Sequence, residues 1–430
     1  DDDDRCTITG TGDANENVFS STSTGSLTLM NLVFTGAGPG ASGVLVNLLG
    51  SVDADGYTLT VRNVESSENG ADGIEARFDE DDGDIVLDFT DVVARRNGNN
   101  GFDVDINTDD TSTVTLKNVV ATDNDNVGAE FDDESNGGMT YTIDESDFSN
   151  NDDGLIIDGT SAGGNQIGAL TVTIDEVTAS SNGNAAGADD GIQISYPNGA
   201  DDVSVTITNT VANGNTQDGV VVTRVGGSGA LTVVLERVTT NDNTEDGVHV
   251  LRNGGSGVTT VGVDKGVSTG NDDIGYHVEA AGGGGVAVVF VDVNADSNGS
   301  DEADDDNIQV LESGGGDLDA SFTNVRASGA KAGTGLHVDE SGGGDARVLL
   351  DHVTASGNGE WGIELHETNG GAMTLRLAAP ITTSSNGEDG LRIDANPQVL
   401  LAAGTLADVS GTNNGEYLVN IVDGLAIPNN

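Results

Sequence analysis

Apolar and polar positions alternate along this chain in short runs that return about every 28 residues. The clearest run is a phrase of Asp or Asn, then Gly, an apolar, a polar and an apolar residue, as in residues 72–76, 246–250 and 389–393. Its glycine, called the anchor glycine here, recurs as Gly73, Gly101, Gly128, Gly154, Gly191, Gly219, Gly247, Gly275, Gly335, Gly362 and Gly390, with Asn307 once in its place. A fixed period of this length is typical of a solenoid.

Each period contains three alternating segments that are too short for helices and are bounded by Gly, Asn or Asp. Because strand side chains alternate, the residue after the anchor is predicted to point inward and the next one outward. The inward row is Ile74, Phe102, Ala129, Leu155, Ile192, Val220, Val248, Tyr276, Ile308, Leu336, Ile363 and Leu391. The pattern predicts an all-β parallel solenoid of about 13 coils, with three short strands in each coil.

An asparagine stands four residues before the anchor in nine of twelve coils. These residues are Asn69, Asn97, Asn124, Asn150, Asn215, Asn243, Asn271, Asn358 and Asn386. Asparagine tolerates the left-handed backbone region and bonds to local backbone, which suits a tight turn. Stacked once per coil, the amides are expected to bond to one another in a structural ladder without a catalytic role.

With its repeated Asn-Gly-x-x-Gly-Ile-like phrase, the chain resembles the right-handed parallel β-helix proteins of the pectate-lyase-like superfamily over residues 18–422. The resemblance implies a right-handed, single-stranded β-helix. It leaves the activity open, because that superfamily contains lyases, hydrolases and epimerases as well as adhesins, tail spikes and surface proteins. Since a repeat array extends one core, we expect a single domain over 1–430, with a lead-in at 1–17 and a tail at 423–430.

The chain has 73 acidic and 15 basic residues and a formal net charge of −58. A field of this sign repels nucleic acid and anionic membranes. The sequence contains no run of 18 apolar residues, so no membrane-spanning segment is expected. Cys6 is the single cysteine, so no intrachain disulfide is expected. The acidity fits either solubility in salt-rich surroundings or specific cation binding. A chain that opens with four aspartates fits a processed protein, and we expect an extracellular or cell-surface location.

Acidic side chains gather at outward third-strand positions of four successive early coils, around Arg77. They are Glu75, Asp103, Asp105, Glu130, Asp132 and Asp158. Carboxylates about 5 Å apart repel by roughly 1 kcal/mol per pair even in water, so a neutralising Ca²⁺ or another cation is expected there. The resemblance to calcium-dependent lyases implies that Arg77 is the base beside a metal held by Glu75, Asp103 and Glu130. The alternative is a solvated acidic face.

Other catalytic signatures of related enzymes are missing from the sequence. There is no Gly-His-Gly with paired aspartates, as in polygalacturonases, and no Asp-Pro-His, as in alginate epimerases. His249, His277 and His337 share one outward row, yet their own coils supply no consistent companion carboxylate. Stacked surface histidines are therefore favoured over a two-histidine metal site.

We expect a non-catalytic extracellular structural protein, as a subunit of a head-to-tail filament or part of a cell-surface adhesin. Open strand edges at both ends would pair with another copy of the chain, and surface glycans are further candidate partners. The alternative is a polysaccharide-active enzyme, a calcium-dependent lyase of acidic glycans that works in an outer groove. No organic cofactor is expected.

Overall fold

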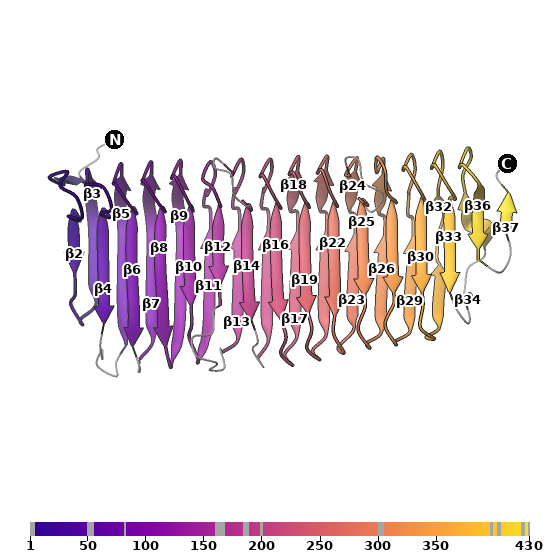
Figure 1. The fold of residues 1–430 in the computed structure, drawn as a ribbon, viewed down its shortest axis with the longest axis horizontal. Coiled ribbons are helices and arrows are strands. Elements are labelled where there is room, and N and C mark those ends of the chain that lie inside the picture. The colour runs from indigo at the N-terminus through magenta and orange to yellow at the C-terminus, as the bar shows by residue number, and fades with distance from the viewer. Residues whose placement is uncertain are drawn as a thin grey trace. The chain divides into compact units, whose positions relative to one another are not determined.

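The computed structural model describes residues 5–49, 56–80, 83–159, 168–183, 189–197, 201–299, 305–395, 399–401, 406–422 and 426–428. It divides into two units, Asp1–Gln217 and Asp218–Asn430. Each unit is a stack of coils in which parallel strands pair with their counterparts in the neighbouring coils (Figure 1). The units together have about 13 coils of about 28 residues, which confirms the predicted parallel β-solenoid. One domain over 1–430 stays a prediction.

The first unit has two parallel sheets. Sheet A consists of β1 (Cys6–Thr9), β3 (Leu27–Thr35), β5 (Tyr57–Ser67), β7 (Ile85–Arg95), β9 (Thr111–Thr122), β11 (Gly138–Asp144), β13 (Leu170–Asp175) and β15 (Val203–Thr208). Sheet B consists of β2 (Phe19–Ser21), β4 (Val44–Leu49), β6 (Ile74–Glu80), β8 (Phe102–Thr108), β10 (Ala129–Asp133), β12 (Leu155–Asp158) and β14 (Ile192–Pro197).

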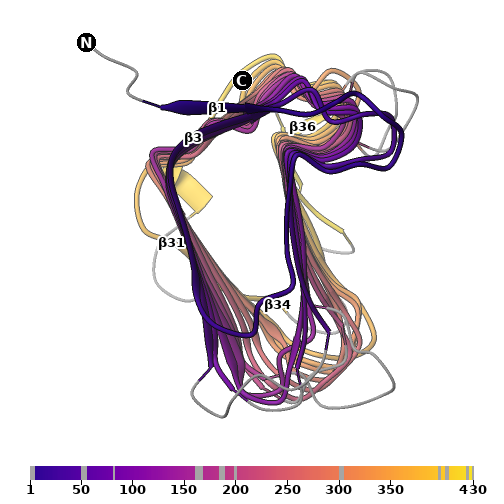
Figure 2. The same ribbon diagram turned by 90° about the vertical axis from the view of Figure 1, so that its left-hand side faces the viewer.

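The second unit repeats this arrangement. Its sheet A has β17 (Leu231–Glu236), β20 (Thr259–Asp264), β23 (Val286–Val291), β26 (Leu318–Thr323), β29 (Ala346–Asp351), β31 (Met373–Leu377) and β34 (Val399–Leu401). Sheet B has β16 (Val220–Val225), β19 (Val248–Asn253), β22 (Tyr276–Ala281), β25 (Ile308–Glu312), β28 (Leu336–Glu340), β30 (Ile363–Glu367), β33 (Leu391–Ala395), β36 (Tyr417–Ile421) and β37 (Ala426–Pro428). Figure 2 views the coils end on and shows strands along two long sides of each coil.

The predicted second strand follows a corner at the end of sheet A. In the second unit it forms separate short strands, β18 (Thr239–Asn241), β21 (Val267–Thr269), β24 (Asn294–Asp296) and β27 (Arg326–Ser328), then β32 (Ile381–Thr382) and β35 (Val409–Ser410), with a 3-10 helix, η2, at Leu406–Asp408. In the first unit it is fused with the first strand in β5, β7 and β9, whose corner residue has a positive φ. Asn63 and Asn118 suit this left-handed corner, but Arg237 and Lys265 also adopt it.

The core of each unit lies between sheets A and B. Every residue of the predicted inward row is at most 2% exposed, so that prediction is confirmed. Aromatic rings add local contacts between the sheets, such as the edge-to-face pair of Phe89 and Phe102, whose ring centroids are 5.3 Å apart. Small and branched side chains fill most of the remaining layers, because every coil must leave the same interior width for the next.

Buried asparagines form a hydrogen-bonded ladder within each unit. The amide nitrogen of Asn97 donates to Oδ1 of Asn124 at 2.9 Å, and the same oxygen accepts the backbone N–H of Asn97 at 3.1 Å. The ladder residues are Asn69, Asn97, Asn124, Asn151, Asn182 and Asn215 in the first unit, and Asn243, Asn271, Asn298, Asn307, Asn358, Asn386 and Asn414 in the second.

Asn151 stands where the sequence suggested Asn150. Asn151 is fully buried, and its Oδ1 accepts from the amide nitrogen of Asn124 at 3.1 Å. Asn150 is instead the residue directly before the ladder asparagine, and its backbone is in the left-handed region with φ 61°. This coil has one residue fewer between the ladder asparagine and the anchor glycine, so the position four residues before Gly154 is Asn150 and not the ladder residue. The left-handed residue of the turn is thus the one that precedes each ladder asparagine except Asn307.

The anchor glycines permit close approach between coils. A Cβ on Gly73 would lie 2.7 Å from the carbonyl oxygen of Gly101 and 2.8 Å from the amide nitrogen of Asn97. Both distances are shorter than any packing contact, so a side chain is excluded wherever the next coil carries a ladder asparagine. The requirement is one of space, because Gly73 has no positive φ.

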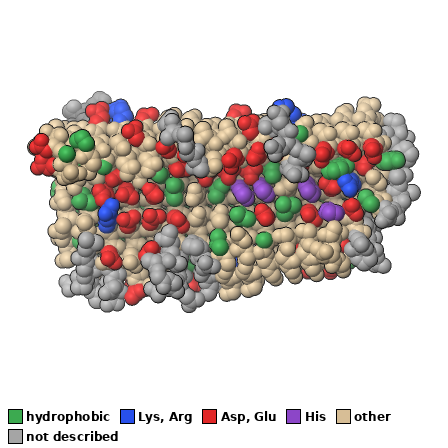
Figure 3. Space-filling view, in the orientation of Figure 1, with side chains coloured by type: hydrophobic (Ala, Val, Ile, Leu, Met, Phe, Trp, Pro, Cys, Tyr) green, Lys and Arg blue, Asp and Glu red, His purple; other side chains and the backbone are tan. Residues whose placement is uncertain are grey.

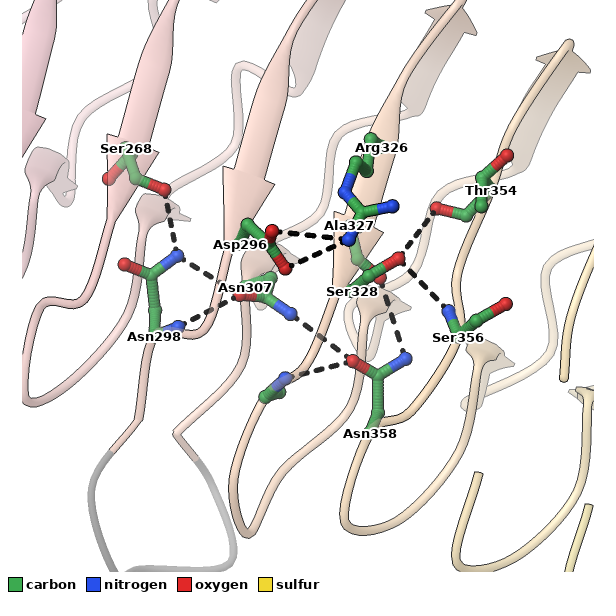
Figure 4. A network of polar contacts seen from close by, with 11 residues as sticks. Ser268, Asp296, Asn298, Asn307, Arg326, Ala327, Ser328, Thr354, Ser356 and Asn358 are labelled. Carbon is green, nitrogen blue, oxygen red and sulfur yellow. Dashed lines mark hydrogen bonds and ion pairs between the residues drawn. The ribbon is translucent and has the colours of Figure 1, made fainter. Parts of the chain in front are cut away.

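Asn307, which replaces an anchor glycine, fills a gap in the ladder (Figure 4). The next coil has Ala330 at the ladder position, where its backbone N–H donates to Oδ1 of Asn358 at 3.0 Å. Asn307 accepts from the amide nitrogen of Asn298 at 3.0 Å and donates to Oδ1 of Asn358 at 3.2 Å. Alanine at position 330 leaves the space of a ladder amide empty, and the side chain of Asn307 occupies that space, so the ladder continues.

Candidate functional site

The predicted acidic cluster lies on sheet B of the first unit in two adjacent rows. Figure 3 shows Asp and Glu side chains gathered in lines along this face. The strand register places Glu75 beside Asp103 and Asp103 beside Glu130 in the upper row. The lower row runs Arg77, Asp105, Asp132 and Asp158. Four strands, β6, β8, β10 and β12, thus bring all seven predicted residues together.

Asp72, directly before the anchor glycine Gly73, adds a carboxylate beside the upper row, and the sequence did not indicate it. Carboxylate oxygens of Asp72, Glu75 and Asp103 all lie within 4.8 Å of one another. Asp72 is buried and its Oδ1 accepts the backbone N–H of Asn100 at 3.0 Å, while Ser42 Oγ donates to Glu75 at 2.7 Å. Three converging oxygens on a rigid sheet are suitable ligands for a hard divalent cation.

The carboxylates of this face are held in a partly desolvated, mutually repulsive group. Burial, followed by the charges of Asp72 and Asp105, raises the pKa of Asp103 to about 7. Burial and the charge of Glu130 raise the pKa of Asp132 to about 6. A bound cation would stabilise the charged form of both carboxylates, because its positive charge offsets the loss of hydration and the repulsion between neighbouring carboxylates.

Arg77 begins the lower row, and its guanidinium reaches Glu75 of the upper row. Its Nη2 is 2.9 Å from Glu75 Oε1 and its Nε is 3.4 Å from Asp105 Oδ2, with the side chain 47% exposed. Next to it is a shallow hollow of about 300 Å³, whose walls include Asp105, Asp132 and Glu134. The guanidinium partly neutralises the two acidic rows. Its ion pairs with two carboxylates favour the charged form, whereas a base that abstracts a proton must be unprotonated.

Aspartates that precede the anchor position, which is Gly247 after Asp246 and Asn307 after Asp306, form a further row of coil-to-coil contacts. In the second unit, Oδ1 of Asp246 accepts the backbone N–H of Ile274 at 2.8 Å, and Oδ1 of Asp306 accepts that of Thr334 at 2.6 Å. The second oxygen faces the outward row of the third strand. This row was not singled out in the sequence, although the Asp-Gly phrase itself was its signal.

His277 and His337 have companion carboxylates in the preceding coil, where the sequence analysis did not look for them. Nδ1 of His277 is 3.0 Å from Oδ2 of Asp246, and Nδ1 of His337 is 3.0 Å from Oδ2 of Asp306. Each partner directly precedes the anchor position of the preceding coil, Gly247 for Asp246 and Asn307 for Asp306, 31 residues before the histidine. Searching within the histidine's own coil could not find it.

Comparisons with known proteins identify no relative of this chain. No family model, no curated protein and no solved structure matches the chain. The described residues also contain no helix that is both long and apolar enough to cross a membrane.

Proposed function

We propose that the protein is a non-catalytic structural solenoid of an extracellular assembly, a filament or a cell-surface adhesin, whose acidic face works with bound Ca²⁺ or a similar cation. A right-handed coil of the pectate-lyase-like kind is part of the same proposal. The observation that carries it is the repetition of polar contacts. Asparagine and aspartate rows link each coil to the next, which suits a module of a structural assembly.

Strand edges support assembly from copies of the chain. Among the described strands, β1 pairs with β3 alone and β34 with β31 alone, so sheet A has an open edge at each of these strands. The edge of β36 in sheet B is instead covered by β37, which pairs with it antiparallel. Contact between β1 of one copy and β34 of another would join unlike edges and would propagate.

The test is negative-stain electron microscopy with and without Ca²⁺, in reducing buffer because Cys6 is exposed. The backbone N–H of Gly10 donates to Thr35 in β3, so by alternation the N–H of Thr7 points away from β3. Thr7→Pro removes that outward donor, and Thr7→Val keeps it. Fibres from the wild type and Thr7→Val, but not from Thr7→Pro, support the proposal. Single particles at every protein and Ca²⁺ concentration contradict it.

The hollow beside Arg77 favours a second candidate, a calcium-dependent lyase of acidic glycans. Its carboxylates would hold the metal and Arg77 would abstract the proton. The ion pairs of Arg77 with Glu75 and Asp105 argue against an unprotonated base. Ultraviolet absorbance of unsaturated products from acidic polysaccharides, abolished by Arg77→Ala and by chelation, would establish this candidate in place of the first.

A further inference from the structure

Two histidines and an aspartate converge on sheet B of the second unit. The register of β19 and β22 places His249 beside His277, and their rings stack with centroids 4.5 Å apart and an angle of 4° between their planes. Asp246 precedes the anchor glycine Gly247, and its carboxylate lies near both rings. One ligand atom from each of the three residues lies within 4.8 Å of the other two.

The carboxylate faces the same nitrogen of both rings. Oδ2 of Asp246 is 3.0 Å from Nδ1 of His277 and 3.7 Å from Nδ1 of His249. Two ligands of one tetrahedral Zn²⁺, each about 2.0–2.1 Å from the metal, are separated by about 3.3 Å. The two observed oxygen–nitrogen distances lie on either side of that value, and both imidazoles must rotate out of their stacked arrangement for their nitrogens to converge on one metal.

The surroundings hold this geometry in place. Oδ1 of Asp246 accepts the backbone N–H of Ile274 at 2.8 Å, which leaves Oδ2 to face the histidines. Oδ2 of Asp218 is 3.8 Å from Nδ1 of His249 and offers a fourth ligand atom. The two imidazole side chains are 24% and 16% exposed, which gives an ion access from solvent. Buried partners of this kind orient metal-binding side chains in proteins.

We propose that Asp246, His249 and His277 form a binding site for a borderline divalent transition metal such as Zn²⁺, with Asp218 as the fourth ligand. The two imidazoles distinguish this site from the acidic face of the first unit. Imidazole nitrogen favours Zn²⁺, Cu²⁺ and Ni²⁺, whereas Ca²⁺ selects oxygen ligands. Because β19 and β22 belong to successive coils, a metal bound here links two coils through their side chains.

The test is a Zn²⁺ titration of the full chain in excess Ca²⁺, which occupies carboxylate sites without competing for imidazole. We expect one tight Zn²⁺ site per chain. His249→Ala and His277→Ala should each weaken its affinity at least about 100-fold, since even second-shell changes cost 10–100-fold. Asp246→Asn retains an oxygen for the N–H of Ile274 and should also weaken binding.

His337→Ala is the matched control. His337 occupies the same row and contacts Asp306 at the same 3.0 Å, but the residue beside it in β25 is Gln309 and in β30 is Glu364. Its replacement should leave Zn²⁺ affinity unchanged. Substitution with Co²⁺ gives an independent readout, because a tetrahedral site with imidazole ligands has a characteristic visible absorption that the variants should lose.

Melting curves in metal-free buffer separate loss of the site from loss of the fold. Variants that melt like the wild type without metal, but are no longer stabilised by Zn²⁺, support the assignment. Zn²⁺ affinity that is unchanged in both histidine variants overturns it, as does the absence of any site that survives excess Ca²⁺.

Discussion

An asparagine amide both donates and accepts, so one residue per coil can bond to the coil before it and the coil after it. Asn97 does this with its side chain buried to 1% exposure. Its Oδ1 also accepts the backbone N–H of Asn69 at 3.2 Å, and its amide nitrogen donates to the carbonyl of Ser66 at 3.2 Å. Four contacts therefore depend on one side chain.

Asn97→Ala should lower the free energy of unfolding by roughly 2–4 kcal/mol, because buried donors and acceptors lose their partners without access to water. Urea unfolding followed by circular dichroism measures the change. Asn107→Ala, at an exposed asparagine of the same unit, is the control and should change stability by less than about 0.5 kcal/mol. Equal effects of the two substitutions would contradict a structural role for the ladder.

The pair of Asn307 and Ala330 gives a sharper test. Asn307→Gly should destabilise the chain by roughly 1–2 kcal/mol, since Asn298 and Asn358 lose their bonds to its side chain. Ala330→Asn alone should also destabilise it, because the new amide competes for the same space. The double variant restores the usual glycine and asparagine and should be more stable than the sum of the two changes, by about 1 kcal/mol or more in a double-mutant cycle.

At the scale of the element, the fifth residue after the anchor decides how sheet B passes into its turn. In β16 and β19 this residue is a buried arginine, and Arg252 donates to the carbonyls of Gly227 and Gly229 at 3.2 and 3.1 Å. In β25, β28 and β30 it is Glu312, Glu340 or Glu367, each fully buried. Glu340 accepts the N–H of Gly344 at 3.2 Å. The charge thus matches the backbone groups that the glycine-rich turn presents.

These glutamates predict a pH dependence of stability. Burial and the neighbouring Glu312 raise the pKa of Glu340 to about 7, so the folded state binds its proton more tightly than the unfolded state does. Stability should be greatest below the ordinary glutamate pKa and fall as the pH rises through 7. Glu340→Gln mimics the neutral acid and should raise stability at pH 8 by on the order of 2 kcal/mol.

Thermal melts between pH 5 and pH 8 measure this effect. The slope of melting temperature against pH should become shallower in Glu340→Gln and stay unchanged in Glu388→Gln, which alters an exposed glutamate of the same unit. A wild-type melting temperature that rises over this range would contradict the raised pKa.

The period and the alternation of the chain predicted the coils and the inward row, because both depend on local spacing alone. The acidic rows were also accessible, since in-register stacking of equivalent positions follows from the repeat. The partners of His277 and His337 were missed because they lie one coil away. Asp72 was missed because the Asp-Gly phrase was interpreted only as a mark of the repeat. Glu340 was missed because burial at the end of a strand depends on how the following turn folds back over it.

At the scale of the whole molecule, a net charge of −58 makes stability depend on ions. Chelation and low salt should lower the melting temperature at pH 8, and Ca²⁺ should restore it, because screening and binding both relieve repulsion. Burial raises the pKa of Asp103 to about 7, so mild acidification should partly replace Ca²⁺ by neutralising the same group.

Asp103→Asn tests whether the effect is local to the acidic rows. It should raise the melting temperature in chelator and reduce the response to Ca²⁺, whereas Asp125→Asn, at an exposed position with the same change of net charge, should do neither to the same extent. Identical curves for the two variants would assign the ion dependence to net charge alone.

The exchange between Asn307 and Ala330 bears on how such an array evolves. Repeat proteins grow and shrink by duplicating or deleting whole coils, which requires every coil to fit any neighbour. Deleting residues 308–335 would remove Ala330 and set Asn307 against the amide of Asn358, in space that admits only glycine. Deleting residues 220–247 would join two ordinary coils. Around Asn307 the two coils that contain Asn307 and Ala330 can thus be duplicated or deleted only together, and the loss of one of them alone would disrupt the packing.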